Sequence, residues 1–192
     1  MFHTNICSEI HTDTSQQKNI CLIGLIGNAG SGKSTVAKYL VDKGFYKLSF
    51  SDPLKRMLIM AGLSTYDELY IKKSKTARWL MQKIGTDIVR NQIDRDFWIK
   101  KLKENIDYLL QRNIYQFVID DVRFINEADF VKSYNGILIK INRDVLPYQD
   151  IYNHESESEL HLIKYDYEIV NNGSTDDLKS SVDNIISKIW KK

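Results

Sequence analysis

The 192-residue chain has little cysteine and little proline, with two residues of each. Cys7 stands in a polar stretch and Cys21 in an apolar run, so the two are a poor disulfide pair, and a reducing, intracellular setting is favoured. The four histidines are scattered, and no cysteine–histidine cluster has the spacing of a metal site. These scarcities argue against a disulfide scaffold and against a structural zinc site.

The sequence also lacks a long hydrophobic run and an excess of one charge. The longest apolar run near the amino terminus, ICLIGLIG at residues 20–27, is too short to cross a bilayer. Lysine and arginine number 27 and aspartate and glutamate 25, which gives a net charge of +2 and no basic excess for nucleic acid. We therefore expect a cytoplasmic protein that binds neither membranes nor nucleic acid.

No linker rich in proline, glycine or serine divides the chain, and no internal repeat is visible. Residues 1–18 are polar and lack an apolar signal core, so we expect a frayed tail. With 43% apolar and 27% charged residues, the composition is that of an ordinary globular protein. The sequence predicts a single domain over residues 19–192.

Apolar runs that suit buried parallel strands alternate with helical patterns along the chain. The expected strands cover residues 20–26, 45–50, 114–120, 136–142 and 167–170. The expected helices cover residues 33–43, 77–90, 97–110 and 126–133, and a last one lined by Leu178, Val182, Ile185, Ile186 and Ile189. Repeated strand–helix–strand units predict an α/β protein with a parallel sheet covered on both faces, and ligands at the carboxyl ends of its strands.

Local signals mark three helix ends. Gly44 is expected to close the first helix, and Asp52 followed by Pro53 predicts a helix start with Asp52 as the cap. Ser174 with Asp177 resembles a capping box for the last helix. The apolar face of the first helix is expected to consist of Val36, Ala37, Leu40 and Val41.

The sequence GNAGSGKS at residues 27–34 fits the phosphate-loop pattern G-x-x-x-x-G-K-[ST] between a predicted strand and a predicted helix. Its glycines let successive backbone N–H groups form an anion nest, to which the helix adds its positive dipole end. Lys33 supplies a mobile charge for the outer phosphates, and the Ser34 hydroxyl can ligate Mg²⁺. We predict binding of ATP or GTP with Mg²⁺ through Gly27, Asn28, Ala29, Gly30, Ser31, Gly32, Lys33, Ser34 and Thr35.

The third expected strand ends in two acids followed by an arginine. Asp120 and Asp121 lie at the sheet edge where the phosphate loop is expected, so one of them is predicted to hold Mg²⁺ directly or through water. Arg123 should point into the same cleft, where its planar guanidinium suits a phosphate. The alternative is a surface arginine paired with Glu127.

The stretch 53–111 has helical spacing and no strand signal, so we expect the acceptor site there. Arg78, Gln82 and Thr86 fall at i, i+4 and i+8 and form a stripe that combines a cation with neutral hydrogen-bonding groups. A solvated helix face explains this stripe equally well.

Further charged and aromatic side chains are spread over this stretch. Lys55 and Arg90 add cations, and Asp87 either reads a base edge or pairs with Arg90. Core packing is favoured over stacking on a base for Trp79, Phe97 and Trp98.

Several motifs occur in a characteristic order. They are GNAGSGKST, FSDPLK at 50–55, ARWLMQKIGTDIVR at 77–90 with DFWIKKL after it, DDVRFINEADF at 120–130, HESE at 154–157 and IVNNGS at 169–174. This series resembles the phage- and virus-type deoxynucleoside monophosphate kinases, relatives of adenylate kinase. The resemblance implies a three-layer α/β/α phosphate-loop kinase fold, with a five-stranded parallel sheet, a helical insert at about 53–111 and a short lid at about 143–162.

The resemblance also implies a reaction: ATP phosphorylates a deoxynucleoside monophosphate to the diphosphate for DNA precursor synthesis. Asp121 would lie near Mg²⁺ with Ser34, and Arg123 at the monophosphate. Residues 144–161 contain no lysine or arginine, so Arg143 would neutralise the transferring charge together with Lys33 and Arg123. The implied catalytic residues are Lys33, Asp121, Arg123 and Arg143.

The resemblance assigns binding residues as well. Asn172 and Gly173 would border the donor adenine. The predicted acceptor-binding residues are Ser51, Asp52, Lys55, Arg78, Gln82, Asp87, Arg90 and Arg123.

Other readings stay open. Dephospho-coenzyme A kinase and animal-type phosphomevalonate kinase share this plan, so another phosphorylated acceptor is an alternative. A non-kinase nucleotide-binding regulator is a second, although it leaves the cationic stripe unexplained. Near-neutral charge disfavours a nucleic-acid 5′-kinase. The resemblance is compatible with a homodimer, and the many isoleucines, asparagines, lysines and tyrosines suit an AT-rich, viral genome.

Overall fold

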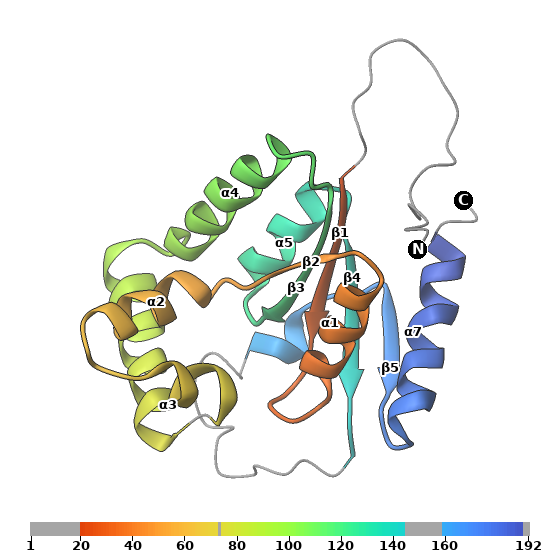
Figure 1. Ribbon diagram of the computed structural model, residues 1–192, viewed down its shortest axis with the longest axis horizontal. Helices are drawn as coiled ribbons and strands as arrows, with labels where there is room; N and C mark the ends of the chain where they lie inside the picture. The colour runs from red at the N-terminus through yellow and green to blue at the C-terminus, as the bar shows by residue number, and fades with distance from the viewer. Residues whose placement is uncertain (1–19, 73, 145–158, 190–192) are drawn as a thin grey trace.

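The computed structural model of the chain describes residues 20–72, 74–144 and 159–189 (Figure 1). The predicted tail at 1–18, Cys7, and the HESE motif within the predicted lid lie outside the described residues. Among the described residues, no helix has the length and apolar character that a membrane span requires.

Five parallel strands form one sheet, as predicted, and their order in the sheet is β2-β3-β1-β4-β5. The strands are β1 (Cys21–Ile26), β2 (Tyr46–Leu48), β3 (Gln116–Val122), β4 (Ile137–Asn142) and β5 (Tyr167–Val170). Parallel neighbours need crossover connections, and the helices between the strands supply them.

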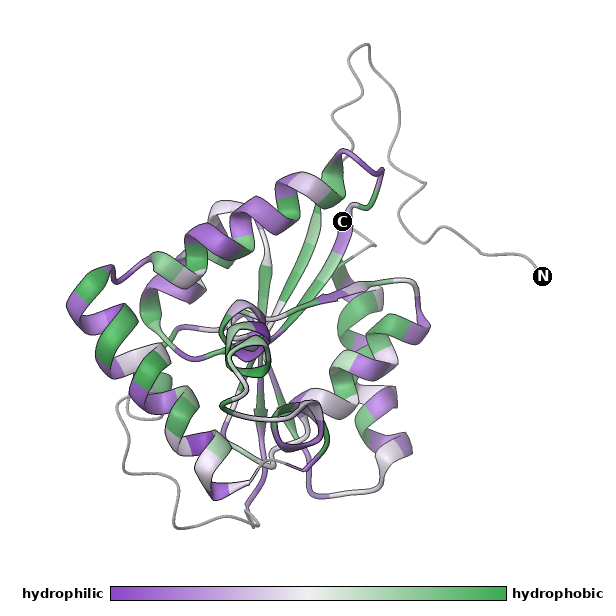
Figure 2. Cartoon of the chain, turned by 60° about the vertical axis from the view of Figure 1, so that its left-hand side comes forward, coloured by the Kyte–Doolittle hydropathy of each residue, from purple (hydrophilic) through white to green (hydrophobic). Residues whose placement is uncertain are grey.

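Helices cover both faces of this sheet and make three layers (Figure 1). On one face lie α1 (Lys33–Asp42) and α7 (Thr175–Ile189), and on the other lie α4 (Phe97–Leu110) and α5 (Ile125–Ser133). Alternate strand residues enter the two cores: Phe117 and Ile119 face α4, whereas Val118 faces α1. Figure 2 shows the matching alternation of hydrophobic and hydrophilic residues around the helices.

The end of β3 differs from the sequence expectation. The sequence predicts that the strand ends at Asp120 and Asp121, whereas β3 continues past both acids to Val122. The reason is tertiary: the pairing of β1 with β3 shifts register between Gly24 and Ile26, and Ile26 then pairs with Val122. Single-sequence patterning does not reveal such a bulge.

The first and last helices follow the local signals closely. Gly44, in the left-handed region at φ 99°, follows α1. The capping box of α7 is confirmed, because Ser174 N–H donates to the Asp177 carboxylate at 2.9 Å and Asp177 N–H donates to Ser174 Oγ at 3.2 Å. The prediction for Val41 is wrong: it is 41% exposed, because it lies at the margin of the apolar stripe, whereas Val36, Ala37 and Leu40 are buried.

The described part of the segment between β2 and α4 consists of helices joined by turns and contains no strand. It contains α2 (Asp52–Met60), η1 (Asp67–Ile71), α3 (Lys75–Gln82) and η2 (Lys83–Ile93), of which η1 and η2 are wide turns of π-helix. The one helix expected at 77–90 is therefore α3 followed without a break by η2. A small core of its own joins these elements through Leu54, Leu58, Leu69 and Ala77.

Two helix starts in this segment need correction. Asp52 is the first residue of α2 and not its cap; Ser51 precedes the helix and makes no side-chain capping bond. The Asp52 carboxylate instead accepts the Tyr70 hydroxyl at 3.1 Å. α3 begins before Ala77, because Ser74 caps it by accepting the Ala77 N–H at 3.0 Å.

Candidate active site

The loop between β1 and α1 has the backbone of an anion-binding nest. Gly27 has φ 149° and Gly32 has φ 114°, conformations that side-chain-bearing residues rarely adopt. A Cβ atom at Gly27 would clash with the Ile141 carbonyl oxygen, and one at Gly32 would lie 2.5 Å from Asn171 Nδ2. Both glycines are thus required by conformation and by close packing.

Lys33 is the first residue of α1 and is buried. Its Nζ donates to the carbonyl oxygens of Gly27, at 2.5 Å, and Asn28, at 2.8 Å. Ser31 Oγ is buried, and it has no hydrogen-bond partner among the described residues. A buried hydroxyl without a partner among the described residues, beside an ammonium group in a glycine-rich loop, fits a loop that binds an anionic phosphate chain.

A first cavity of about 320 Å³, here called the donor cavity, opens beside this loop. Its walls join the loop to Arg143 after β4, to Gly173 after β5 and to the start of α7. Its lining residues are Gly30, Gly32, Lys33, Ser34, Thr35, Arg143, Asn171, Gly173, Thr175 and Leu178. The structure thereby brings Arg143 and Gly173 to the phosphate loop.

The two asparagines after β5 have different surroundings. Asn172, predicted to border the donor base, is not in the lining; its amide exchanges hydrogen bonds with Asp144, at 2.6 and 3.1 Å. Asn171 lines the donor cavity, and its Nδ2 donates to the Ser31 carbonyl at 2.8 Å. Sequence reasoning missed Asn171, although a polar residue directly after an apolar strand was the available signal.

A second cavity of about 260 Å³, here called the acceptor cavity, lies between the sheet edge and α2, α3 and η2. The predicted stripe of Arg78, Gln82 and Thr86 lines it, which decides against the solvated-face alternative. Its remaining polar lining residues are Lys33, Ser34, Ser51, Lys55, Glu68, Asp120, Asp121, Arg123 and Glu127. The apolar part of the wall includes Leu54, Met81 and Trp98.

Close packing shapes this wall. A Cβ atom at Gly85 would lie 2.6 Å from Leu54 Cδ2, so η2 approaches α2 as closely as a glycine allows. Trp98 Nε1 donates to the Gly85 carbonyl at 2.8 Å, which fixes the indole against the cavity. Trp79, by contrast, is 59% exposed.

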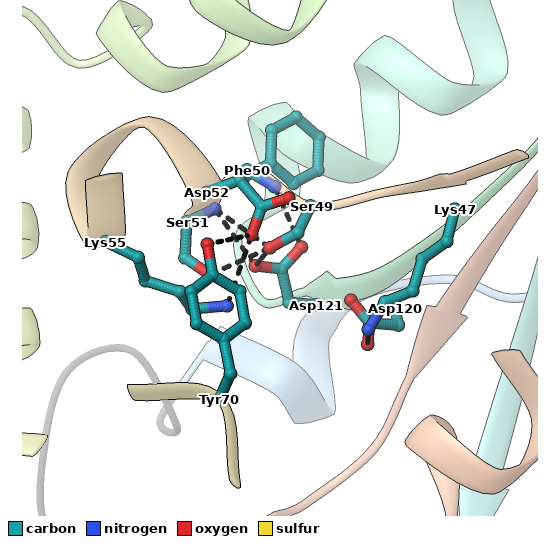
Figure 3. Close-up of polar contacts among 9 residues, drawn as sticks. All are labelled: Lys47, Ser49, Phe50, Ser51, Asp52, Lys55, Tyr70, Asp120 and Asp121. Atoms are coloured by element: carbon teal, nitrogen blue, oxygen red, sulfur yellow. Dashed lines mark hydrogen bonds and ion pairs between the residues drawn. The ribbon is translucent and has the colours of Figure 1, made fainter. Parts of the chain in front are cut away.

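Asp121 ties the segment after β2 to β3 (Figure 3). Its carboxylate accepts Ser49 Oγ at 2.6 Å, Phe50 N–H at 2.9 Å and Ser51 N–H at 3.1 Å. Burial opposes ionisation, but the Lys55 ammonium and these hydrogen bonds lower the pKa of Asp121, so the group is a carboxylate at neutral pH.

Asp120 has a different partner. It forms an ion pair with Lys47 at 2.6 Å, away from the hydrogen bonds around Asp121 (Figure 3). Burial and the neighbouring charge of Asp121 raise the pKa of Asp120, although Lys47 opposes the shift. Both acids share the acceptor cavity with Ser34, so a cation held on a phosphate chain would find a hydroxyl and a carboxylate there. The described residues contain no group of three metal-binding side chains.

The Lys55 ammonium group lies between two neighbouring side chains, Asp52 and Tyr70. Its Nζ lies 3.5 Å from the Asp52 carboxylate and 4.7 Å from the centre of the Tyr70 ring (Figure 3). Burial, together with the charge of Asp52, raises the pKa of Tyr70 to about 12, so Tyr70 is a neutral hydrogen-bond donor to that carboxylate. Asp52 itself does not line the cavity; it supports Lys55.

Arg123 lines the acceptor cavity together with Arg78. Its position decides against the alternative of an arginine on the outer surface. Burial lowers the pKa of Arg123, although Asp121 and Glu127 oppose the shift, and a guanidinium keeps its charge at neutral pH. The cavity therefore places two arginines beside acidic side chains that include Asp120 and Asp121.

Asp87 and Arg90 do not reach this cavity. Asp87 forms an ion pair with Lys83 at 3.0 Å. The Arg90 guanidinium is buried, stacks 3.8 Å above the Phe124 ring and donates to Asn126 Oδ1 at 3.3 Å. Since Phe124 lines the cavity, Arg90 packs behind the wall rather than in it.

Comparisons with known proteins identify relatives of this chain. A family model described as deoxynucleotide monophosphate kinase matches residues 63–182. A protein of Acanthamoeba polyphaga mimivirus named "Putative deoxynucleotide monophosphate kinase" is 37% identical over 184 residues, covering 84% of this chain and 93% of that protein. Deoxynucleotide monophosphate kinase of Escherichia phage RB69 is 28% identical over 116 residues, covering 60% of this chain and 47% of the phage protein.

A solved structure supports the fold. Dephospho-CoA kinase from Campylobacter jejuni superimposes with a TM-score of 0.53 at 19% identity, covering 89% of this chain and 97% of that chain. At this identity the likeness concerns the fold alone, and it agrees with the three-layer arrangement around a parallel sheet.

Proposed function

This chain belongs to the deoxynucleotide monophosphate kinase family and phosphorylates deoxynucleoside monophosphates, and we propose that it does so where the donor and acceptor cavities meet, with ATP and Mg²⁺. The observation that carries this proposal is a shared wall: Gly30, Lys33 and Ser34 line both cavities. A triphosphate in the loop and a monophosphate on the arginines would then have their reacting groups on the same lysine.

The acceptor phosphate is already an anionic oxygen nucleophile, so no general base is needed. Catalysis consists of positioning and charge neutralisation. Lys33, at the junction, contacts the transferred group, while Arg123 holds the acceptor phosphate and Arg143 approaches from the donor side. Bound Mg²⁺ would neutralise phosphate oxygens, with Ser34 as its hydroxyl ligand and Asp121, or the neighbouring Asp120, as its carboxylate.

The acceptor nucleotide lies across the stripe of α3 and η2. We assign Arg78 and Lys55 to its phosphate end because, like Arg123, they are cations that line the acceptor cavity. Gln82 and Thr86 are assigned to the base, against the apolar side of the cavity. Asp87 and Arg90, outside the lining, are assigned supporting roles in place of the contacts predicted from the sequence.

The donor nucleotide lies in the other cavity. The loop residues from Gly27 to Thr35 hold its phosphates, and Gly173 borders its base. The lining also supports adding Asn171 to this set. Asn172, bonded to Asp144, would act through that residue rather than on the nucleotide.

An acceptor panel tests the proposal. ADP release is measured with ATP and dAMP, dGMP, dCMP, dTMP and dUMP, with ribonucleotides and dephospho-coenzyme A as controls. We expect turnover that depends on a deoxynucleoside monophosphate. ATP hydrolysis at the same rate with and without acceptors would support the regulator reading instead, and turnover with dephospho-coenzyme A alone would support the other kinase class.

Three further features stay proposals: one domain over residues 19–192, a cytoplasmic location and a homodimer. Near-neutral charge supports the absence of nucleic-acid binding. Light scattering during size-exclusion chromatography measures the oligomeric state, and a monomeric mass at working concentrations would remove the homodimer.

A further inference from the structure

Glu127 lines the acceptor cavity but has no part in the chemistry above. It lies in the first turn of α5, is 6% exposed and aims its carboxyl group back past the start of the helix. Its Oε2 accepts the backbone N–H of Arg123 at 2.7 Å and that of Phe124 at 3.2 Å. Glu127 therefore fixes the backbone at Arg123, the residue assigned to the acceptor phosphate, by two hydrogen bonds.

The local sequence explains why Glu127 makes these bonds. Phe124 precedes α5, in the place where serine, threonine, aspartate or asparagine usually caps a helix, and its side chain has no oxygen to offer. The first N–H groups of a helix need acceptors, and Glu127 supplies one from three residues further on.

A helix cap alone does not account for where the carboxyl group lies. Capping carboxylates do well at the solvent-exposed surface, whereas Glu127 is buried in the same cavity as Asp121, and burying a second acid there costs free energy. Burial and the charge of Asp121 raise the pKa of Glu127 to about 8. The buried position of the Glu127 carboxyl group is explained if acceptor binding requires a fixed backbone at Arg123.

We propose that Glu127 is a positioning residue for the acceptor phosphate: its two hydrogen bonds fix the backbone at Arg123 and so hold that guanidinium in the acceptor cavity before substrate arrives. A cation that is already in position need not be ordered when substrate binds. The positioning of Arg123 therefore increases the affinity for the acceptor and leaves the affinity for ATP unchanged. This inference rests on the proposed role of Arg123.

Two substitutions at Glu127 test it by steady-state kinetics. Glu127→Ala removes both hydrogen bonds and is expected to raise the acceptor KM roughly ten- to hundredfold, with the ATP KM within about twofold of wild type. Glu127→Gln keeps an oxygen that accepts both N–H groups, and should restore the acceptor KM to within about threefold of wild type. Glu127→Asp, one methylene shorter, replaces the alanine variant if that variant does not fold.

A control variant separates positioning from helix stability. Lys132, at the opposite end of α5, donates to the Gly136 carbonyl at 3.0 Å and pairs with Asp166 at 2.9 Å. Lys132→Ala weakens the same helix away from the cavity, so its acceptor KM should stay at the wild-type value even where its melting temperature falls as far as that of Glu127→Ala.

The outcomes are distinct. An unchanged acceptor KM in folded Glu127→Ala or Glu127→Asp overturns the inference, as does an equal rise in the ATP and acceptor KM. Failure of Glu127→Gln to rescue overturns the hydrogen-bond explanation. Arg123→Ala is measured in parallel. If its acceptor KM is unchanged, the proposed role of Arg123 is wrong. If the acceptor KM rises in Arg123→Ala but not in Glu127→Ala, only the inference about Glu127 is wrong.

Discussion

The donor and acceptor cavities are built by different means. The donor cavity depends chiefly on one loop of the backbone, whose conformation its glycines impose, with a few side chains from the ends of β4 and β5. The acceptor cavity depends on side chains from α2, α3, η2, β3 and α5, brought together only by packing. A site made of backbone tolerates change around it, whereas a site made of converging side chains depends on each supporting contact.

The largest expected effect is at the residue that the two cavities share. Lys33→Ala should lower kcat by about 10³-fold or more, because it removes a fixed positive charge from the transferred phosphoryl group. The fold should persist, as judged by circular dichroism, since water can donate to the Gly27 and Asn28 carbonyl oxygens that Lys33 contacts. Lys38→Ala, exposed on the same helix, is the control, and near-normal turnover in folded Lys33→Ala would contradict the assignment.

A cation on the acceptor side should give a smaller and one-sided effect. Arg78→Ala is expected to raise the KM for the monophosphate by roughly ten- to hundredfold, because charge-assisted hydrogen bonds to a phosphate are lost. The KM for ATP should not move. Arg112→Ala, whose guanidinium stacks on Tyr108 at the surface, is the matched arginine control. A rise in both KM values would mean that the two cavities are not separable.

Changing the packing of η2 against α2 should have the next largest effect, on both stability and the KM for the monophosphate. Gly85→Ala places a methyl group against the buried Leu54 side chain, and overpacking of this kind costs about 1–3 kcal/mol of stability. Because both residues line the acceptor cavity, the KM for the monophosphate should rise with that loss. Chemical denaturation together with steady-state kinetics checks both parts; a stability unchanged from wild type would show that Leu54 has room to move.

The last expected effect concerns how stability depends on pH. The folded pKa of Glu127, about 8, lies above the ordinary value of 4.5, so the folded protein keeps a proton that the unfolded chain releases. Raising the pH from about 4.5 to about 8 therefore lowers the free energy of unfolding, by at most about 1.4 kcal/mol per pH unit from this group. The lowered pKa of Asp121 acts in the opposite sense, and its stabilisation is lost as the pH falls through the acid range.

Urea denaturation at several pH values measures this slope. Glu127→Gln has no proton to lose, so its stability should fall less than that of the wild type between pH 6 and 8, a window inside the shift of this pKa. Parallel curves for the two proteins would show that Glu127 does not titrate in that window.

The sequence predicted the donor side more closely than the acceptor side. Ser174 and Asp177 cap α7 as expected, and Gly27, Gly30 and Gly32 between β1 and α1 have positive φ angles, in keeping with the predicted need for glycine there. Each of these features depends on residues a few positions apart. Asn171 was missed because its contact with Ser31 joins residues far apart in the chain.

On the acceptor side, the sequence spacing identified the helix face that lines the cavity, but not every residue that does or does not line it. Arg78, Gln82 and Thr86 share the cavity as their spacing of four residues predicts. Arg90, one helical turn further, is stacked on Phe124 instead, and Asp52 supports Lys55 without lining the cavity. Periodicity gives the direction in which a side chain leaves its helix, but not which neighbouring element blocks it.

The sequence by itself determined the parallel sheet, the phosphate loop and the family, because these follow from hydrophobic patterning and from backbone conformations that a few glycines impose. Only the tertiary structure decided that β3 continues past Asp121 to Val122, that Arg90 packs behind Phe124, and that Glu127 accepts the backbone N–H of Arg123. Those outcomes depend on strand register and on contacts between helices distant in sequence, and local physical preferences carry no information about either.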